Sequence, residues 1–217
     1  MFTLGSLYFY GTGVTKDTDK AYDLFIKAGQ KGDASALRML GYMFYNGKGV
    51  NKDTNKAVSY FEQAVEKGST FAMVTLGKMY EKGNALPKDS DKALELYTKA
   101  AENSDSSGQY ELGRMLYSVQ NYTASFKWFK QSAEQNNKNA LYMVGAMYHN
   151  GDGMKYDSDT AAQWFSKSVR SGSQDGLDAL MKLEKTGNSV AKQELCSLYK
   201  DQKIGKDNYI DKLCKGQ

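Results

Sequence analysis

Histidine and cysteine, the side chains that most often carry nucleophilic and metal chemistry, are scarce in this chain of 217 residues. His149 is its only histidine, so the sequence cannot assemble a metal site from several histidines. In the repeat described below, its place matches that of Tyr45 and Tyr117, which predicts a surface side chain rather than a catalytic one. We therefore predict no catalytic residue, no metal and no cofactor, and expect that the chain is not an enzyme.

The two cysteines, Cys196 and Cys214, both lie near the C-terminus. Two thiols are too few for a disulfide framework or a four-thiolate zinc site. If the terminal helix folds back on the one before it, the sulfurs come within bonding distance, and a disulfide there would indicate an oxidising compartment. The alternative is a pair of free cysteines, with Cys196 buried. Both readings stay open, so we expect a periplasmic or secreted protein if they are bonded and a cytoplasmic one otherwise.

Glycine pairs along the chain resemble phosphate-binding loops in sequence, but they lie between different secondary-structure elements. Gly11-Thr12-Gly13-Val14 follows a predicted helix and recurs, whereas a dinucleotide loop follows a strand and leads into a helix. Five residues separate Gly41 from Gly47 where a P-loop has four, and Gly49 stands where Ser or Thr would bind magnesium. These glycines therefore predict turns and not nucleotide sites.

Composition excludes two further classes of protein. The net charge of +4 is modest for this length, and a nucleic-acid protein would show a denser basic stripe. No apolar run approaches the roughly 20 residues that a membrane span needs. We therefore expect neither a nucleic-acid partner nor a membrane span, while 41% hydrophobic residues are enough for a core.

An internal repeat defines the elements that must position any functional side chain. A Leu-Gly pair occurs at Leu4-Gly5, Leu40-Gly41, Leu76-Gly77 and Leu112-Gly113 and then as Val144-Gly145, with spacings of 36 residues three times and then 32. The following segment carries a small residue four positions before an aromatic one, at Ala21/Phe25, Ala57/Phe61, Ala93/Tyr97, Ala124/Trp128 and Ala161/Phe165. Such a period predicts a solenoid of helix hairpins, whose small residues let the two helices approach closely.

The connections repeat as well. The pairs Gly11/Gly13, Gly47/Gly49 and Gly151/Gly153 are predicted to end a first helix with residues at positive φ. The acids predicted at the start of the second helices are Asp17, Asp53, Asp89 and Asp157. The third loop has Ala85 in place of the second glycine. The fourth lacks about five residues between Leu116 and Ala124, which predicts a tight turn around Gln120-Asn121.

The repeat resembles the Sel1-like repeat family, a relative of the tetratricopeptide repeats. The resemblance is carried by the Leu76–Tyr80 segment, the Gly-x-Gly-Val loops and the Lys-Asp-x-x-Lys-Ala openings. The resemblance covers residues 1–172 as five repeats and leaves 173–217 as a degenerate repeat with capping helices in the same solenoid. It implies an all-α, right-handed α/α solenoid with a C-terminal helical cap.

Within the C-terminal part we expect a helix over Gln174–Lys185, a degenerate first helix with Cys196 in the glycine position, and a polar cap over Lys206–Leu213. Because Met1–Gly5 aligns with Met73–Gly77, the first repeat is truncated, and we expect the natural chain to extend upstream.

Without catalytic residues, function is expected on the concave groove that first helices line in such an array. Counting from each repeat glycine, we expect the residues three before and one, four and five after it to face the groove. Outside the partner-binding set, these positions hold Phe2, Ser6, Phe9, Tyr10, Val74, Glu81, Ser118 and Ala146. The predicted partner-binding residues are Arg38, Tyr42, Tyr45, Asn46, Lys78, Lys82, Tyr110, Arg114, Tyr117, Tyr142, His149 and Asn150. This set is rich in Tyr and Arg, which are enriched in binding hot spots.

The resemblance implies an adaptor, scaffold or inhibitor that is monomeric alone and holds a partner protein in this groove. Bacterial immunity or secretion and host interaction is one role, and a eukaryotic quality-control or signalling scaffold is another. A Tyr-rich groove that stacks on a glycan or cell-wall fragment remains an alternative. An enzyme is disfavoured because Glu81 is the only carboxylate among the groove positions, and acid–base hydrolysis needs a pair.

Overall fold

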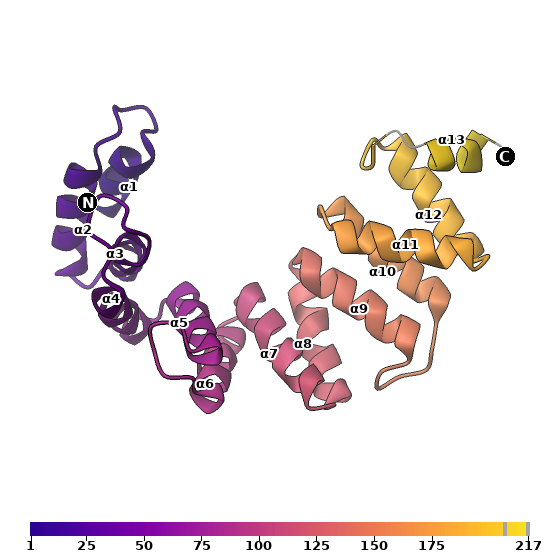
Figure 1. Ribbon diagram of the computed structural model, residues 1–217, viewed down its shortest axis with the longest axis horizontal. Helices are drawn as coiled ribbons and strands as arrows, with labels where there is room; N and C mark the ends of the chain where they lie inside the picture. The colour runs from indigo at the N-terminus through magenta and orange to yellow at the C-terminus, as the bar shows by residue number, and fades with distance from the viewer. Residues whose placement is uncertain (206–207, 216–217) are drawn as a thin grey trace. The chain divides into compact units, whose positions relative to one another are not determined.

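The computed structural model describes residues 1–205 and 208–215, and every regular element within them is a helix. The helices follow one another as hairpins (Figure 1). Their bounds are α1 Phe2–Tyr10, α2 Thr18–Gly29, α3 Ala34–Asn46, α4 Thr54–Glu66, α5 Thr70–Lys82, α6 Ser90–Glu102, α7 Ser106–Ser118, α8 Tyr122–Glu134, α9 Lys138–Asn150, α10 Ser158–Arg170, α11 Gln174–Lys185, α12 Ser189–Lys200 and α13 Asn208–Lys215. The chain is an all-α solenoid of helix pairs, and none of the described helices is long and apolar enough to cross a bilayer.

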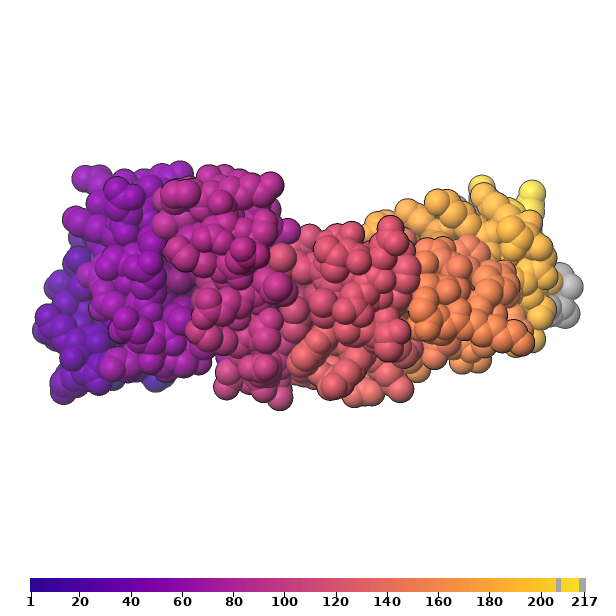
Figure 2. All heavy atoms as spheres, turned by 90° about the horizontal axis from the view of Figure 1, so that it is seen from below, coloured from indigo at the N-terminus to yellow at the C-terminus, as the bar shows by residue number. Residues whose placement is uncertain are grey.

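The chain divides into two compact units, Met1–Gly108 and Gln109–Gln217. Within the first unit, α2 packs on α3 and α4 on α5, so each hairpin rests on the next. Within the second unit, α8 packs on α9 and α10 on both α11 and α12. The space-filling view shows the heavy atoms of successive hairpins in contact within each unit (Figure 2). Each unit therefore has apolar clusters of its own, formed between consecutive helices.

The hairpins from α1/α2 to α9/α10 close on one recurring contact between a glycine and a ring. A Cβ added to Gly41 would lie 2.7 Å from the ring of Phe61, closer than a carbon atom can pack. The same contact joins Gly5 to Phe25, Gly77 to Tyr97, Gly113 to Phe129 and Gly145 to Phe165. These rings are all buried. The absence of a side chain on the first helix therefore makes room for the aromatic side chain of the second.

The fourth hairpin corrects one prediction. The predicted small/aromatic pair Ala124/Trp128 is wrong, because the structure buries Ser125 and Phe129 instead. The buried ring stands 16 residues after its glycine, against 20 in the other hairpins, so four residues are missing and not five. The Ser125 hydroxyl donates a 2.8 Å hydrogen bond to the carbonyl oxygen of Gly113, a contact that alanine cannot make. The glycine–ring contact sets the register here.

The helix ends follow the predicted loop chemistry. Gly11, Gly47 and Gly151 end their helices in the left-handed region, with φ of 74°, 64° and 74°. The predicted acids Asp17, Asp53, Asp89 and Asp157 are all N-caps whose carboxylates accept backbone N–H groups. The hydrogen bond from the Lys20 amide lowers the pKa of Asp17 below its usual value, as the bond from the Thr160 amide does for the pKa of Asp157.

The two departing loops each place a residue other than glycine at positive φ. Ala85 takes φ 65° in the third loop, and Gln120 takes φ 61° in the short fourth turn. Asn121 then caps α8. The tight turn predicted around Gln120-Asn121 is confirmed.

The C-terminal part contains the predicted helix Gln174–Lys185 as α11. Helix α12 follows, and Cys196 on it is buried, joined by a disulfide to Cys214 of α13, with 5.5 Å between the Cα atoms. The predicted cap over 206–213 is described from residue 208 onward, as α13, and residues 206 and 207 lie outside the described part of the chain. The Tyr199 hydroxyl also donates a 2.9 Å hydrogen bond to Asp211. The disulfide and this bond hold α13 against α12.

Replacing Gly41 with Ala sets two effects of opposite sign against each other. Helix propensity alone favours Ala by about 1 kcal/mol, whereas forcing a Cβ against the Phe61 ring costs about 1–3 kcal/mol. We expect Gly41→Ala to lower the midpoint of denaturant unfolding, and the double variant Gly41→Ala/Phe61→Leu to recover part of the loss. A higher midpoint for Gly41→Ala would show that the ring does not limit the approach of the two helices.

The disulfide should stabilise the docking of α13. A cross-link that closes 18 residues contributes about 3 kcal/mol in the chain-entropy model. We expect Cys214→Ser to raise amide hydrogen exchange in α13 at least about tenfold, with exchange in α9 and α10 unchanged. A reducing agent should have the same effect on the wild type and none on Cys214→Ser. Equal protection of α13 in the two proteins would contradict this account.

Candidate functional site

The predicted groove positions differ in how far the structure exposes them. The residue five after the glycine is exposed in all five repeats, whereas the residue one after it is exposed as Tyr42 and Lys78 and half-buried in the other three repeats. The residues three before and four after it lie one helical turn from the glycine itself, on the face that meets the second helix. They are therefore more covered than the sequence analysis expected.

The residues three before the glycine rest on the hairpin aromatic. Ring centroids lie 5.8 Å apart for Phe2 and Phe25, 5.7 Å for Tyr110 and Phe129, and 5.6 Å for Tyr142 and Phe165. The groove-facing prediction is wrong for Val74, which is buried at 7% exposure. Tyr110 and Tyr142 are half-buried, each with part of its surface still exposed.

The residues four after the glycine are mostly engaged within the fold. The prediction for Phe9 is wrong, since it is buried at 7% exposure in the first core cluster. Tyr45 is half-buried against the neighbouring apolar cluster. Glu81 accepts a 3.0 Å hydrogen bond from the buried hydroxyl of Tyr97, the one ring of the series that carries a polar group. Only His149 among these five is exposed.

Two predicted residues on α7 have structural partners. The Tyr117 hydroxyl donates a 2.6 Å hydrogen bond to Asp152, in the loop after α9, and its ring meets Tyr122 at 5.2 Å. Partial burial is the larger cause and this hydrogen bond the second of a rise in the pKa of Tyr117 to about 12. Arg114 forms a 2.9 Å ion pair with Glu111, which is largely buried. The Tyr117 hydrogen bond joins α7 to the loop after α9, whereas the Arg114–Glu111 pair lies within α7.

Exposed aromatic side chains gather on the first helices of the first unit. Tyr10 is 66%, Tyr42 37% and Phe71 52% exposed. Phe9 contacts both Tyr10 and Tyr42, with centroids 5.0 and 6.2 Å away. The Arg38 guanidinium, one turn from Tyr42 on α3, lies 4.8 Å from the Phe71 ring centroid. We call Tyr10, Tyr42, Arg38 and Phe71, contributed by α1, α3 and α5, the aromatic strip.

Phe71 was not among the predicted surface residues. It stands seven residues before Lys78, on the same stripe of α5, and a count continued by one heptad would have found it. Asn46 and Lys82 lie exposed near the C-terminal ends of α3 and α5. The Asn46 amide donates a 2.9 Å hydrogen bond to the carbonyl of Tyr42.

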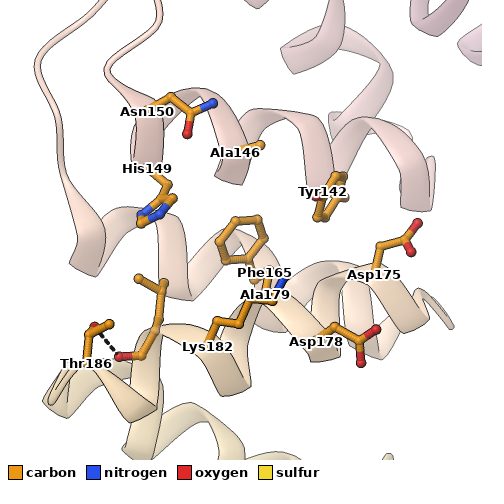
Figure 3. Close-up of a pocket in the computed structure, with 11 residues that line it drawn as sticks. Tyr142, Ala146, His149, Asn150, Phe165, Asp175, Asp178, Ala179, Lys182 and Thr186 are labelled. Carbon is orange, nitrogen blue, oxygen red and sulfur yellow. Dashed lines mark hydrogen bonds between the residues drawn. The ribbon is translucent and has the colours of Figure 1, made fainter.

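The second unit contains an open pocket of about 410 Å³ between α9, α10 and α11, which we call the α9–α11 pocket. Its lining includes three predicted partner-binding residues, Tyr142, His149 and Asn150. Figure 3 shows Tyr142 and His149 projecting from α9 on one side and the side chains of α11 on the other. Asp175, Asp178 and Lys182 of α11 complete its charged groups. The sequence predicted a helix over Gln174–Lys185 but no binding residue on it, so these three were missed.

The side chains at these surfaces stack on one another and form hydrogen bonds and ion pairs. Within residues 1–205 and 208–215, no three His, Cys, Asp or Glu side chains gather in a way that could hold a metal ion. Burial raises the pKa of Tyr110, and the charges of Glu111 and Asp175 contribute to the rise, so the phenol stays neutral at physiological pH. Rings, amides, carboxylates and a guanidinium are what these surfaces offer to a partner.

The Tyr117–Asp152 hydrogen bond should be visible in the pH dependence of stability. Because folding raises the pKa of Tyr117 from 10.0 to about 12, its contribution is complete below pH 10 and is lost as the pH rises towards 12. We expect Tyr117→Phe to cost about 1 kcal/mol of unfolding free energy at neutral pH, and this difference to shrink above pH 10. Tyr10→Phe, which alters an exposed ring, is the control. A difference that is constant across this range would contradict the assignment.

Comparison with known proteins identifies the repeat. A sequence model of the Sel1 repeat matches the chain five times, at residues 1–33, 34–69, 70–105, 106–137 and 138–173. No curated protein sequence matches the chain.

Solved structures show the same fold. A protective antigen of uropathogenic Escherichia coli with an SLR fold is 28% identical, with a TM-score of 0.75 over 94% of this chain and 49% of that one, so the chain spans about half its length. A Sel1 repeat protein from Oxalobacter formigenes is 26% identical, with a TM-score of 0.75 over 99% of this chain and 86% of the other. An immunity protein of Pseudomonas aeruginosa is 19% identical, with a TM-score of 0.57 over 98% and 79%, a likeness of fold alone. Because the five matched repeats cover residues 1–173, the chain belongs to the Sel1 repeat family.

Proposed function

We propose that the chain is a non-enzymatic scaffold or inhibitor that binds a partner protein through the exposed stripes of its first helices. The observation that carries this proposal is the aromatic strip. Three large rings are 37–66% exposed on the first helices of three successive hairpins, although every hairpin has a core in which such side chains are ordinarily buried. An exposed apolar surface of this kind marks a binding site.

The strip has the composition of a binding hot spot. Aromatic and Arg side chains are enriched where an interface gains most of its free energy, and single anchors contribute about 2 kcal/mol or more. Arg38 lies against the Phe71 ring, which orders the guanidinium while its N–H groups remain able to bind carboxylates or backbone carbonyls. On this proposal, rings bury apolar groups of the partner and Arg38 orients it.

For the biological role we propose bacterial immunity or secretion and host interaction. The support is the occurrence of a protective antigen and an immunity protein among the proteins of like fold. The Cys196–Cys214 disulfide favours a periplasmic or secreted location, because such bonds persist in oxidising compartments. A eukaryotic quality-control or signalling scaffold is the alternative role for the same surface.

The proposal is tested by removing the strip without touching the core. A partner captured from the native source is identified and purified. It is then titrated calorimetrically against the wild type, a strip variant and a control variant. We expect Tyr10→Ser/Phe71→Ser to weaken binding by at least about 30-fold, which corresponds to about 2 kcal/mol. The control Leu94→Ser/Val119→Ser removes two exposed apolar side chains elsewhere and should bind as the wild type does.

Both variants alter exposed side chains, so their thermal midpoints should match that of the wild type within a few degrees. Equal affinity of the strip variant and the wild type would place the binding surface elsewhere. Binding to a glycan panel that the strip variant loses, with no protein partner retained, would favour the glycan alternative instead.

A further inference from the structure

The α9–α11 pocket has an apolar floor and a charged rim. Phe165, Ala146, Ala179 and Leu183 supply the apolar surface. Its volume of about 410 Å³ lies in the range of small-ligand sites, which is room for one long side chain with the backbone on either side of it and too little for a folded element. A partner would therefore enter this pocket through an extended segment.

The charges on the rim are unevenly distributed. In Figure 3, Asp175 and Asp178 lie at the end of the pocket beside Tyr142, and His149 and Thr186 lie at the other end. Asp175 and Asp178 are three residues apart on α11, so their side chains share one face of that helix. The Gln174 amide donates a 3.0 Å hydrogen bond to one oxygen of Asp178 and so orients that carboxylate. This end is locally acidic in a chain whose net charge is +4.

Figure 3 shows the Tyr142 side chain at the same end of the pocket as the two carboxylates. Tyr142 is half-buried, held with its centroid 5.6 Å from that of Phe165. Burial raises the pKa of Tyr110 on α7, and the negative charge of Asp175 adds to the rise. A flat cation that can stack on a ring and bind two carboxylates through several N–H groups fits this end better than a point charge does.

We propose that the acidic end of the α9–α11 pocket takes the side chain of an arginine on an extended segment of the partner protein. The guanidinium stacks on Tyr142 and donates hydrogen bonds to Asp175 and Asp178, while the methylene groups cover the apolar floor. Lys182, on the same helix, carries a like charge; its side chain is exposed and moves aside when the arginine enters. This inference rests on the proposed function only in assigning the arginine to a protein.

The test uses peptides and needs no partner. The probes are Ac-Gly-Gly-X-Gly-Gly-amide with X as Arg, Lys, Gln or Glu, added to the ¹⁵N-labelled chain while amide shifts of α9 and α11 are followed. We expect the Arg peptide to bind about tenfold more tightly than the Gln peptide and severalfold more tightly than the Lys peptide, with affinity falling as salt is raised.

Matched variants separate this pocket from general attraction to acidic residues. Asp175→Asn/Asp178→Asn should reduce Arg-peptide affinity about tenfold. The control Asp19→Asn/Asp23→Asn removes two exposed carboxylates at comparable places on α2 and should leave it unchanged. Lys182→Gln should strengthen binding two- to threefold, because a like charge is removed.

The assignment would be overturned by tighter binding of the Glu peptide or by equal binding of the Arg and Gln peptides. It would also be overturned if amide shifts changed only outside α9, α10 and α11. None of these results bears on the aromatic strip, which lies in the other unit, so the proposed function stands or falls by its own experiment.

Discussion

The contact between a glycine on one helix and a buried ring on the next sets the geometry of every full repeat. Gly41 and Phe61 show why neither residue can change alone: a Cβ at 2.7 Å leaves no room for the ring, and a smaller ring-side residue would leave a void beside the glycine. With the hairpin closed in this way, other apolar residues of both helices pack against the neighbouring repeats. Core clusters between hairpins follow from that spacing.

The recurring order of small, apolar and loop residues was enough to predict the fold, because each hairpin depends on contacts between residues close in sequence. Asp89 as an N-cap and Gln120 as a turn residue could be predicted for the same reason. The pair Ala124/Trp128 could not be corrected from the sequence. Ser125/Phe129 fits the same spacing of a small and an aromatic residue, and the hydrogen bond from Ser125 to Gly113 exists only in three dimensions. Counting residues across a shortened turn left the register uncertain by one.

The candidate surfaces were predicted less well, for a geometric reason. Positions were counted from the glycine, but the residues one turn away from it share its inward face, so Phe9 and Val74 are buried. Tyr42 and Asn150, one and five residues after a glycine, lie on the outward stripe and are exposed. The acids of the α9–α11 pocket lie on α11, outside the matched repeats, where the periodic pattern carries no information.

The turn between α7 and α8 shows which part of a repeat is free to vary. That connection has lost four residues and both loop glycines, yet Phe129 still covers Gly113 as the other rings cover theirs. The length of the connection can therefore change without changing how the two helices pack against each other. In a longer loop the exposed tip, such as Asn84-Ala85, is a place where foreign sequence can be inserted, whereas Leu86 packs on the apolar cluster and Asp89 caps α6.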